Sequence, residues 1–98
     1  MALKTKQTRY LRSQAHHLKP IIQIGGQGVT VALVGATDDA LDAHELIKVK
    51  LGDVENRDEI RQTAEKLSKE TGSSVVQVIG KTIVLFRQLH KESAYKLP

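Results

Sequence analysis

The chain has 98 residues, 40% of them hydrophobic, which is enough for one compact domain and too little for separate cofactor and substrate domains. It contains no cysteine, which excludes a disulfide framework, a thiolate nucleophile and a thiolate metal site. No apolar run approaches the roughly 18 residues that span a bilayer, and the basic amino terminus lacks the apolar segment of a secretory signal. We therefore expect a cytoplasmic protein with no membrane partner.

Charge is distributed unevenly along the chain, whose formal net charge is +4. Residues 1–37 contain five basic and no acidic side chains, residues 38–70 six basic and ten acidic, and residues 71–98 four basic and one acidic. Positive charge is concentrated at both ends, and this asymmetry indicates a polyanionic partner for one surface. A solvated basic face without a partner is the alternative interpretation.

The first segment predicts an amphipathic helix from about Lys4 to Leu18. At about 100° per residue, Leu11, Ala15 and Leu18 fall on one side. The opposite arc carries the cationic candidates Lys6, Arg9, Arg12, His16 and Lys19. Pro20 ends the helix because it disfavours a helical backbone at the residue before it. The apolar side has too few large residues for a helix that lies on a membrane surface.

A short apolar strand, Ile21 to Ile24, leads into the glycine loop Gly25-Gly26-Gln27-Gly28, which is followed by Val29, Thr30 and a helix. Glycine permits positive φ angles and a close approach of a ligand to the main chain. The first amide groups of a helix lack partners within the helix, and the helix dipole makes that end weakly positive. The loop therefore suits a phosphate or another anion. A tight connection without any ligand explains the same sequence equally well.

A second helix is predicted from Val29 to Ala43, with mostly small side chains directed towards a sheet: Ala32, Leu33, Ala36, Ala40 and Ala43. Gly35 inside this helix costs about 1 kcal/mol relative to alanine unless close packing uses the space. From His44 to Leu51, apolar residues alternate with Lys48 and Lys50, which predicts a strand with one solvent-exposed face.

The rest of the chain predicts a third helix and a β-hairpin. Asn56 suits the N-cap of the helix and Gly72 its carboxyl-terminal stop. Two β-branched runs, Val75 to Ile79 and Thr82 to Phe86, are joined by Gly80-Lys81, the spacing of a two-residue hairpin. We expect a domain of residues 1–89 and a flexible carboxyl-terminal tail of residues 90–98.

The predicted order is helix, strand, helix, strand, helix, strand, strand. Two strand-helix-strand units favour parallel pairing through crossovers, and the hairpin adds an antiparallel strand. The sequence therefore predicts a single-domain α/β fold with a four-stranded mixed sheet packed by helices.

No enzyme motif fits the spacing. Gly80-Lys81-Thr82 lacks the earlier glycine of a phosphate-binding P-loop and precedes a strand, and the glycine loop does not complete a dinucleotide-binding motif. His16 and His17 point about 100° apart on a helix, so they cannot both ligate one metal ion without distortion. We expect no catalytic residue, no metal and no cofactor.

Several short motifs follow one another: Arg9-Tyr10-Leu11-Arg12, His16-His17-Leu18-Lys19-Pro20, Ile24-Gly25, the run from His44 to Lys50 and the run from Val76 to Lys81. In this order and spacing they closely resemble the bacterial YhbY-type proteins, which are stand-alone members of the CRM (chloroplast RNA splicing and ribosome maturation) family. The similarity extends from about Lys4 to Arg87.

The resemblance implies an RNA-binding domain whose fold is similar to the carboxyl-terminal domain of translation initiation factor three. It also implies a GxxG loop between the first strand and the next helix, here Gly25 to Gly28. Relatives often place a lysine inside this loop, whereas Gly26 and Gln27 are uncharged, so backbone N–H groups are the expected contacts. Stand-alone members are associated with precursors of the large (50S) ribosomal subunit.

Residues and resemblance together predict a monomeric, non-enzymatic RNA-binding protein that contacts structured ribosomal RNA during large-subunit assembly, with ribosomal proteins as further partners. The predicted contacts are Lys6, Arg9, Arg12, His16, Lys19, Gly25, Gly26, Gln27, Gly28 and Thr30, and the secondary candidates are Lys48, Lys50 and Lys81. Cations would bind phosphates, and the basic helix and the glycine loop are expected to form one continuous surface.

Two alternative functions come from other classes. A protein-interaction module would dock on a ribosomal or assembly protein through the acidic central segment. A small-molecule, anion-binding enzyme at the glycine loop would require a pocket with convergent titratable groups. With only three aromatic residues, a platform for stacking bases is not expected, and recognition should depend on RNA shape and backbone.

Overall fold

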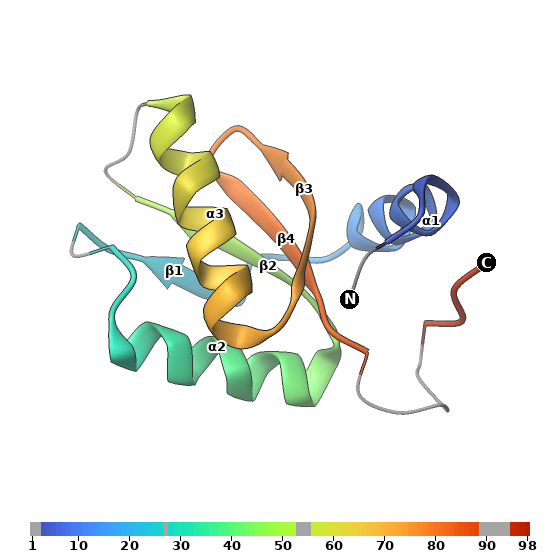
Figure 1. Cartoon of the computed structure of the whole chain (residues 1–98), viewed down its shortest axis with the longest axis horizontal. Helices are drawn as coiled ribbons and strands as arrows, with labels where there is room; N and C mark the ends of the chain where they lie inside the picture. Colours follow the sequence, from blue (N-terminus) through green and yellow to red (C-terminus); the bar gives the residue numbers. More distant parts are fainter. Residues whose placement is uncertain (1–2, 27, 53–55, 89–94) are drawn as a thin grey trace.

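In the computed structural model, the described part of the chain forms three helices and a four-stranded sheet (Figure 1). The structure describes residues 3–26, 28–52, 56–88 and 95–98. The helices are α1 (Thr5–Ala15), α2 (Val31–His44) and α3 (Arg57–Thr71). The strands are β1 (Ile22–Ile24), β2 (Leu46–Leu51), β3 (Ser74–Ile79) and β4 (Thr82–Phe86). The predicted α/β fold and its element order are confirmed. Within the described ranges, no helix is both long and apolar enough to cross a membrane.

The sheet has the strand order β1-β2-β4-β3. β1 pairs in parallel with β2, whereas β4 pairs in antiparallel fashion with β2 on one side and β3 on the other. The first strand-helix-strand unit therefore pairs as predicted. In the second unit, β3 runs in the same direction as β2 but does not pair with it, because the hairpin places β4 between them. A register shift between Val75 and Gln77 marks a bulge in β3 that the sequence pattern did not indicate.

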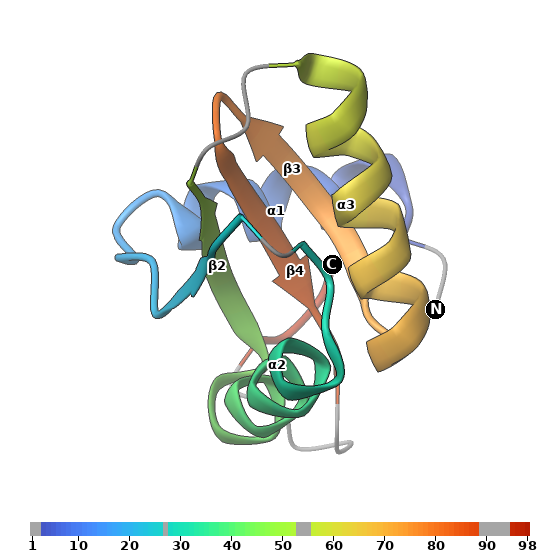
Figure 2. The same cartoon turned by 90° about the vertical axis from the view of Figure 1, so that its left-hand side faces the viewer.

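Helices cover both faces of the sheet (Figure 2). Side chains alternate along a strand, so that odd and even positions of β2 face opposite sides. Ile47, Val49 and Leu51 pack with residues of α2 and α3 in the larger core cluster. Leu46 joins β4 residues and the buried side of α1 in a second, smaller cluster. The strand face predicted to be exposed is therefore partly covered by α1.

Local hydrogen bonds explain where the elements begin and end. Asn56 Oδ1 accepts a hydrogen bond of 2.8 Å from the Asp58 N–H at the start of α3. Gly72 adopts a left-handed conformation with φ of 66° at the other end of that helix. Gly80 has φ of 54° in the two-residue turn between β3 and β4. The predictions for these three positions are confirmed.

The predicted inward face of α2 is confirmed for Leu33 and Ala40, which pack against the larger core cluster, and wrong for its other alanines. Three of the alanines assigned to it are exposed: Ala32, Ala36 and Ala43. Thr37 and Leu41 are fully buried instead, and the Thr37 hydroxyl donates to the Leu33 carbonyl at 2.8 Å. Alanine is tolerated on either side of a helix, so the larger side chain of Leu41 determines which face is buried.

The predicted boundary between the domain and the tail lies in a segment, residues 89–94, that is outside the described residues. Beyond it, Tyr95 and Leu97 pack against the smaller core cluster. The Tyr95 ring meets Phe86 edge-on, with 6.1 Å between ring centroids. The Gln7 side-chain amide donates to the Pro98 carbonyl at 3.3 Å. The end of the chain thus lies against α1 and β4.

Candidate nucleic-acid interface

A hollow of about 360 Å³ lies between α1 and the sheet, and we call it the α1 groove. Cations contribute to it from two separate elements, because α1 and β2 face each other across it. The residues that line it are Arg9, Arg12, Ser13, Ala15, His16, Lys48, Gln77 and Ile79. None of them is acidic.

The groove follows from how α1 sits on the sheet. Leu11 and Ala15 are buried against Leu46, Val84 and Phe86, whereas the sheet around Lys50 and Ile79 is exposed and forms an open half. Arg9, Arg12 and His16 lie three and four residues apart, so they share the flank of the helix that borders the open half. All three side chains are exposed.

A second hollow, which we call the β1 hollow, continues along the edge of the sheet. It measures about 470 Å³ and is lined by Lys19, Pro20, Ile21, Ile22, Gln23 and Lys50. Lys48 of the α1 groove and Lys50 of the β1 hollow are two residues apart on β2, so they point to the same side about 7 Å apart along the strand. Cations from α1, β2 and the segment before β1 therefore form a row on one side of the molecule.

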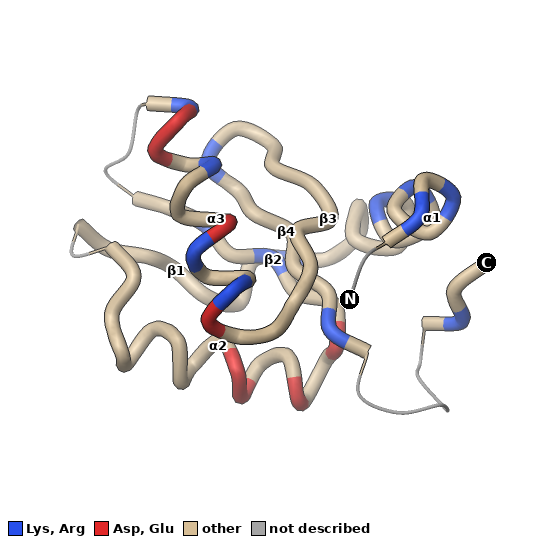
Figure 3. Tube along the Cα trace, in the orientation of Figure 1, with Lys and Arg blue, Asp and Glu red and all other residues tan. Residues whose placement is uncertain are grey.

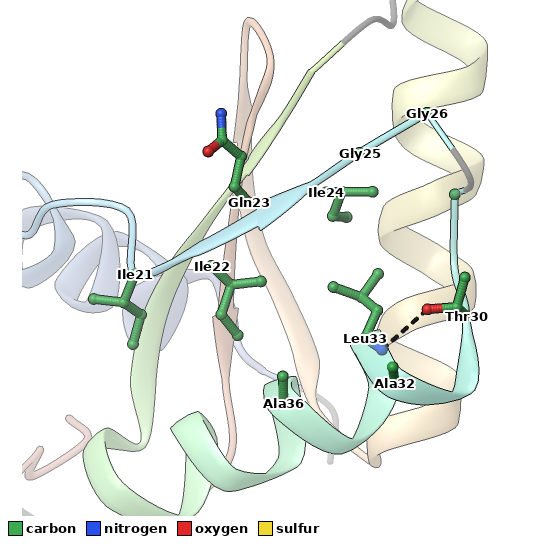
Figure 4. Close-up of a pocket in the computed structure, with 11 residues that line it drawn as sticks. Ile21, Ile22, Gln23, Ile24, Gly25, Gly26, Thr30, Ala32, Leu33 and Ala36 are labelled. Carbon is green, nitrogen blue, oxygen red and sulfur yellow. Dashed lines mark hydrogen bonds between the residues drawn. The ribbon is translucent and has the colours of Figure 1, made fainter.

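The glycine loop lies at the end of β1, where the chain turns towards α2 (Figure 4). Gly25 and Gly26 are exposed, and the Gly28 N–H donates to the Gly25 carbonyl at 3.2 Å. Gly28 has φ of 71°, a conformation that favours glycine. Gln27 lies outside the described residues.

Thr30 has a structural role at the start of α2. Its hydroxyl oxygen accepts a hydrogen bond of 3.1 Å from the Leu33 N–H, as the N-cap of the helix (Figure 4). The helix begins at Val31 and not directly after the loop. The amides of its first two residues, Val31 and Ala32, remain the free donors of this helix end.

The glycine loop and α1 lie towards opposite ends of the molecule (Figures 1 and 2). The expected continuous surface can therefore form only along β1 and the β1 hollow between them. Lys81 lies at the loop's end of the sheet, because Leu51 donates its N–H to the Lys81 carbonyl at 2.8 Å and Gly52 donates to the Ile24 carbonyl at 2.9 Å. Lys6 is exposed on α1 but lines neither hollow.

The basic residues of α1 and the carboxylates of α2 lie on opposite sides of the sheet (Figure 3). Within their bounds, α1 and β2 carry basic residues and no acidic one, and α2 carries Asp38, Asp39 and Asp42 and no Lys or Arg. On α3, which lies on the same side of the sheet as α2, four basic residues are interspersed with four acidic ones. The acidic central segment of the alternative hypothesis is therefore separated from the α1 groove by the sheet.

Some of that acidic charge is neutralised by Arg87, which the sequence analysis did not single out. Its guanidinium group donates to Asp38 at 2.6 Å and to Asp42 at 2.9 Å. It also donates to the carbonyls of Thr71 at 2.6 Å and Asp38 at 3.1 Å. The spacing of Asp38 and Asp42, four residues apart on one helix face, was the available indication that they share a partner.

These features define a small α/β domain with a cationic groove on one sheet face and a glycine loop at the end of an edge strand. Residues 3–87 match the CRS1 / YhbY (CRM) domain. The chain belongs to this family, and the family resemblance inferred from the sequence is confirmed.

Three similar proteins match this chain over nearly the whole length of both chains. Probable RNA-binding protein YqeI from Bacillus subtilis is 43% identical over 97 residues, covering 98% of this chain and 99% of that protein. An RNA-binding protein from Haemophilus influenzae is 38% identical, covering 98% and 95%. The solution structure of SAV1595 from Staphylococcus aureus, described as a candidate RNA-binding protein, superposes with a TM-score of 0.87 at 43% identity, covering 99% of this chain and 100% of the other.

Proposed function

We propose that this protein binds RNA through the α1 groove and the β1 hollow. The observation that carries the proposal is the placement of Arg9, Arg12 and His16 opposite Lys48 across one groove that no acidic residue lines. A row of cations without neighbouring carboxylates attracts a phosphate backbone and releases counterions when it binds. The names of the relatives from Bacillus subtilis and Haemophilus influenzae agree with this function.

The composition of the groove favours recognition of backbone and shape. Gln77 adds a neutral hydrogen-bonding group between the cations, and Ile79, which is 53% exposed, adds apolar contact. None of the three aromatic residues lines the α1 groove or the β1 hollow. Contacts of this kind position phosphates and sugars more than they identify bases.

We further propose that the target is structured ribosomal RNA of the large-subunit precursor. This assignment rests on the resemblance to stand-alone bacterial members of the family. In this proposal the protein acts in the cytoplasm as a monomer, without catalysis or a cofactor, and the glycine loop and Lys81 contact the same RNA at the other end of the sheet.

The experiment measures RNA affinity against salt concentration for Arg9→Ala/Arg12→Ala and for a matched control, Arg61→Ala/Lys66→Ala. Each variant loses two exposed cations, from α1 or from α3, so the two have the same net charge. We expect the α1 variant to weaken binding across unrelated RNA sequences and to lower the slope of log affinity against log salt by about 1.5 to 2. The control should retain the affinity and slope of the wild type. Equal losses in both variants would assign the effect to net charge and contradict the groove.

The ribosomal target needs a separate test. Crosslinking in cells, followed by mapping of the RNA positions, should give sites in precursors of the large-subunit RNA, and these sites should be lost in Arg9→Ala/Arg12→Ala. Crosslinks spread evenly over unrelated RNAs would leave RNA binding intact and refute the ribosomal assignment.

A further inference from the structure

An open hollow of about 650 Å³ lies between the outer edge of β1 and the first two turns of α2 (Figure 4). Its walls are aliphatic, with Ile22 and Ile24 on the strand facing Leu33 on the helix. Ala32 and Ala36 lie one turn apart on α2 and are exposed, and their single methyl groups leave the space unfilled. The volume is in the range of sites that hold small organic groups.

Groups that attract phosphate flank this apolar hollow at both ends. The glycine loop and the free amides at the start of α2 border one end. At the other end, Ile21, Ile22 and Gln23 also line the β1 hollow, which contains Lys19 and Lys50. An occupant with an apolar surface and negative charge on either side of it satisfies this arrangement.

We propose that the hollow takes an unpaired nucleobase of a single-stranded RNA segment, with the neighbouring phosphates at the glycine loop and at Lys19 and Lys50. The proposal rests on the proposed function, and it adds that part of the bound RNA is single-stranded. In a duplex the base faces are stacked and cannot enter the hollow, whereas unpaired bases can be displayed to a protein.

The free edge of β1 supplies polar groups beside the apolar walls. The Ile24 carbonyl accepts from Gly52, so Ile24 directs its peptide groups towards β2. Because peptide groups alternate along a strand, the N–H and carbonyl of Gln23 point to the outer edge, where no strand pairs with β1 in the described structure. One donor and one acceptor from a single residue can pair with the edge of a base.

The test uses Ala32→Leu/Ala36→Leu, which fills the hollow without changing charge, and Ala43→Leu as the control on the same helix. Ala43 is exposed and lies outside the hollow. The probes are a single-stranded RNA, the same strand with abasic sugars in place of its bases, and a blunt RNA duplex of equal length. Circular dichroism establishes that all variants are folded.

The wild type should bind the base-containing strand at least about fivefold more tightly than the abasic strand, since the base adds apolar contact. Ala32→Leu/Ala36→Leu should lose this preference and keep the duplex affinity, whereas Ala43→Leu should keep both. If Ala32→Leu/Ala36→Leu still prefers the base-containing strand over the abasic strand, the hollow holds another occupant, such as a peptide, and the inference is overturned. Failure of the wild type to bind any of the RNAs would instead refute the proposed function.

As a second variant, Ile21→Ser removes an apolar side chain that is 52% exposed at the border of the hollow. Its control is Val78→Ser, a residue 40% exposed on β3 that lines neither this hollow nor the α1 groove. Because Ile21 also lines the β1 hollow, Ile21→Ser should reduce affinity for the base-containing strand more than for the abasic strand. An equal reduction for the abasic strand would contradict base contact.

Discussion

Replacing Arg87 with methionine tests whether this side chain joins α2, α3 and the end of β4 into one unit. The Arg87 side chain is only 18% exposed, and its guanidinium group reaches two carboxylates and two carbonyls. Methionine keeps most of the length and apolar contact of the side chain but removes every one of these hydrogen bonds. We expect the free energy of unfolding to fall while RNA affinity at low temperature stays unchanged, because Arg87 lines neither the α1 groove nor the β1 hollow.

The magnitude follows from the exposure of each partner. Asp38 and Asp42 side chains are 43% and 64% exposed, so solvent limits each ion pair to at most about 1 kcal/mol. The carbonyl of Thr71 belongs to a buried residue, and leaving it unpaired costs about 1–3 kcal/mol. In the opposite direction, Arg87 Nε is buried without a hydrogen-bond partner in the described structure, so replacing it with an apolar atom stabilises the folded state by about 1 kcal/mol. The net loss is about 2 kcal/mol, or roughly 10 °C in melting temperature for a domain of this size.

Thermal unfolding followed by circular dichroism at low and high salt measures this loss. Asp42→Asn serves as the control, because it removes only the more exposed of the two ion pairs, and it should lower the melting temperature by a few degrees at most. If Arg87→Met and Asp42→Asn destabilise equally, or if high salt abolishes the difference between Arg87→Met and the wild type, then Arg87 forms an ordinary surface ion pair and the carbonyl contacts contribute nothing.

Three further predictions concern single positions. Gly35→Ala should stabilise the protein by about 0.5–1 kcal/mol in denaturant unfolding, because Gly35 lies inside α2 and an added Cβ meets nothing within 4 Å; destabilisation would reveal an unseen close contact. Gly25→Asp should weaken RNA binding by adding negative charge to the glycine loop, whereas Gly25→Asn should not, and equal affinities for the two would contradict a phosphate at this loop. Burial, and to a smaller extent the negative charge of Glu45, raises the pKa of Tyr95 above its ordinary value of 10.0. The folded state therefore keeps the phenolic proton up to a higher pH than the unfolded state does. Stability contributed by Tyr95 is therefore present below about pH 10 and is lost as pH rises through the folded pKa, and in melts at about pH 9 and pH 11 the wild type should lose more stability than Tyr95→Phe.

Strong local patterns predicted most of the fold. Turn and cap residues such as Asn56, Gly72 and Gly80 act within a few residues of themselves, so the sequence around them is enough to place the ends of α3 and the hairpin. Three residues of the α2 face, Ala32, Ala36 and Ala43, were assigned wrongly because alanine suits either side of a helix. The position of β4 between β2 and β3 depends on pairing between distant segments, which a local pattern does not contain.

The sequence predicted the charged residues of the candidate site but not the shape of the α1 groove. The spacing of Arg9, Arg12 and His16 indicated one cationic helix face. In the structure this face lies opposite Lys48 and Gln77, because α1 packs across the sheet and because β3 has the register that it has. A pattern along the sequence reveals neither the packing nor the register. The glycine loop follows α1 closely in the sequence, which suggested that the two lie side by side. In the structure β1 leads the chain away from α1 to the other end of the sheet (Figure 1).

The carboxylates of α2 also bear on the proposed RNA binding, although the sheet lies between them and the α1 groove. A protein of net charge +4 with its charges mixed evenly would attract a polyanion weakly from every direction. Here the sheet separates the cations of α1 and β2 from the carboxylates of α2, while the charges of α3 balance, so the proposed RNA partner would be attracted most strongly to the α1 side (Figure 3). Opposite charges across an interface act mainly on the rate of association and on register. In the proposed complex the carboxylates of α2 would therefore favour the orientation in which the α1 groove faces the RNA.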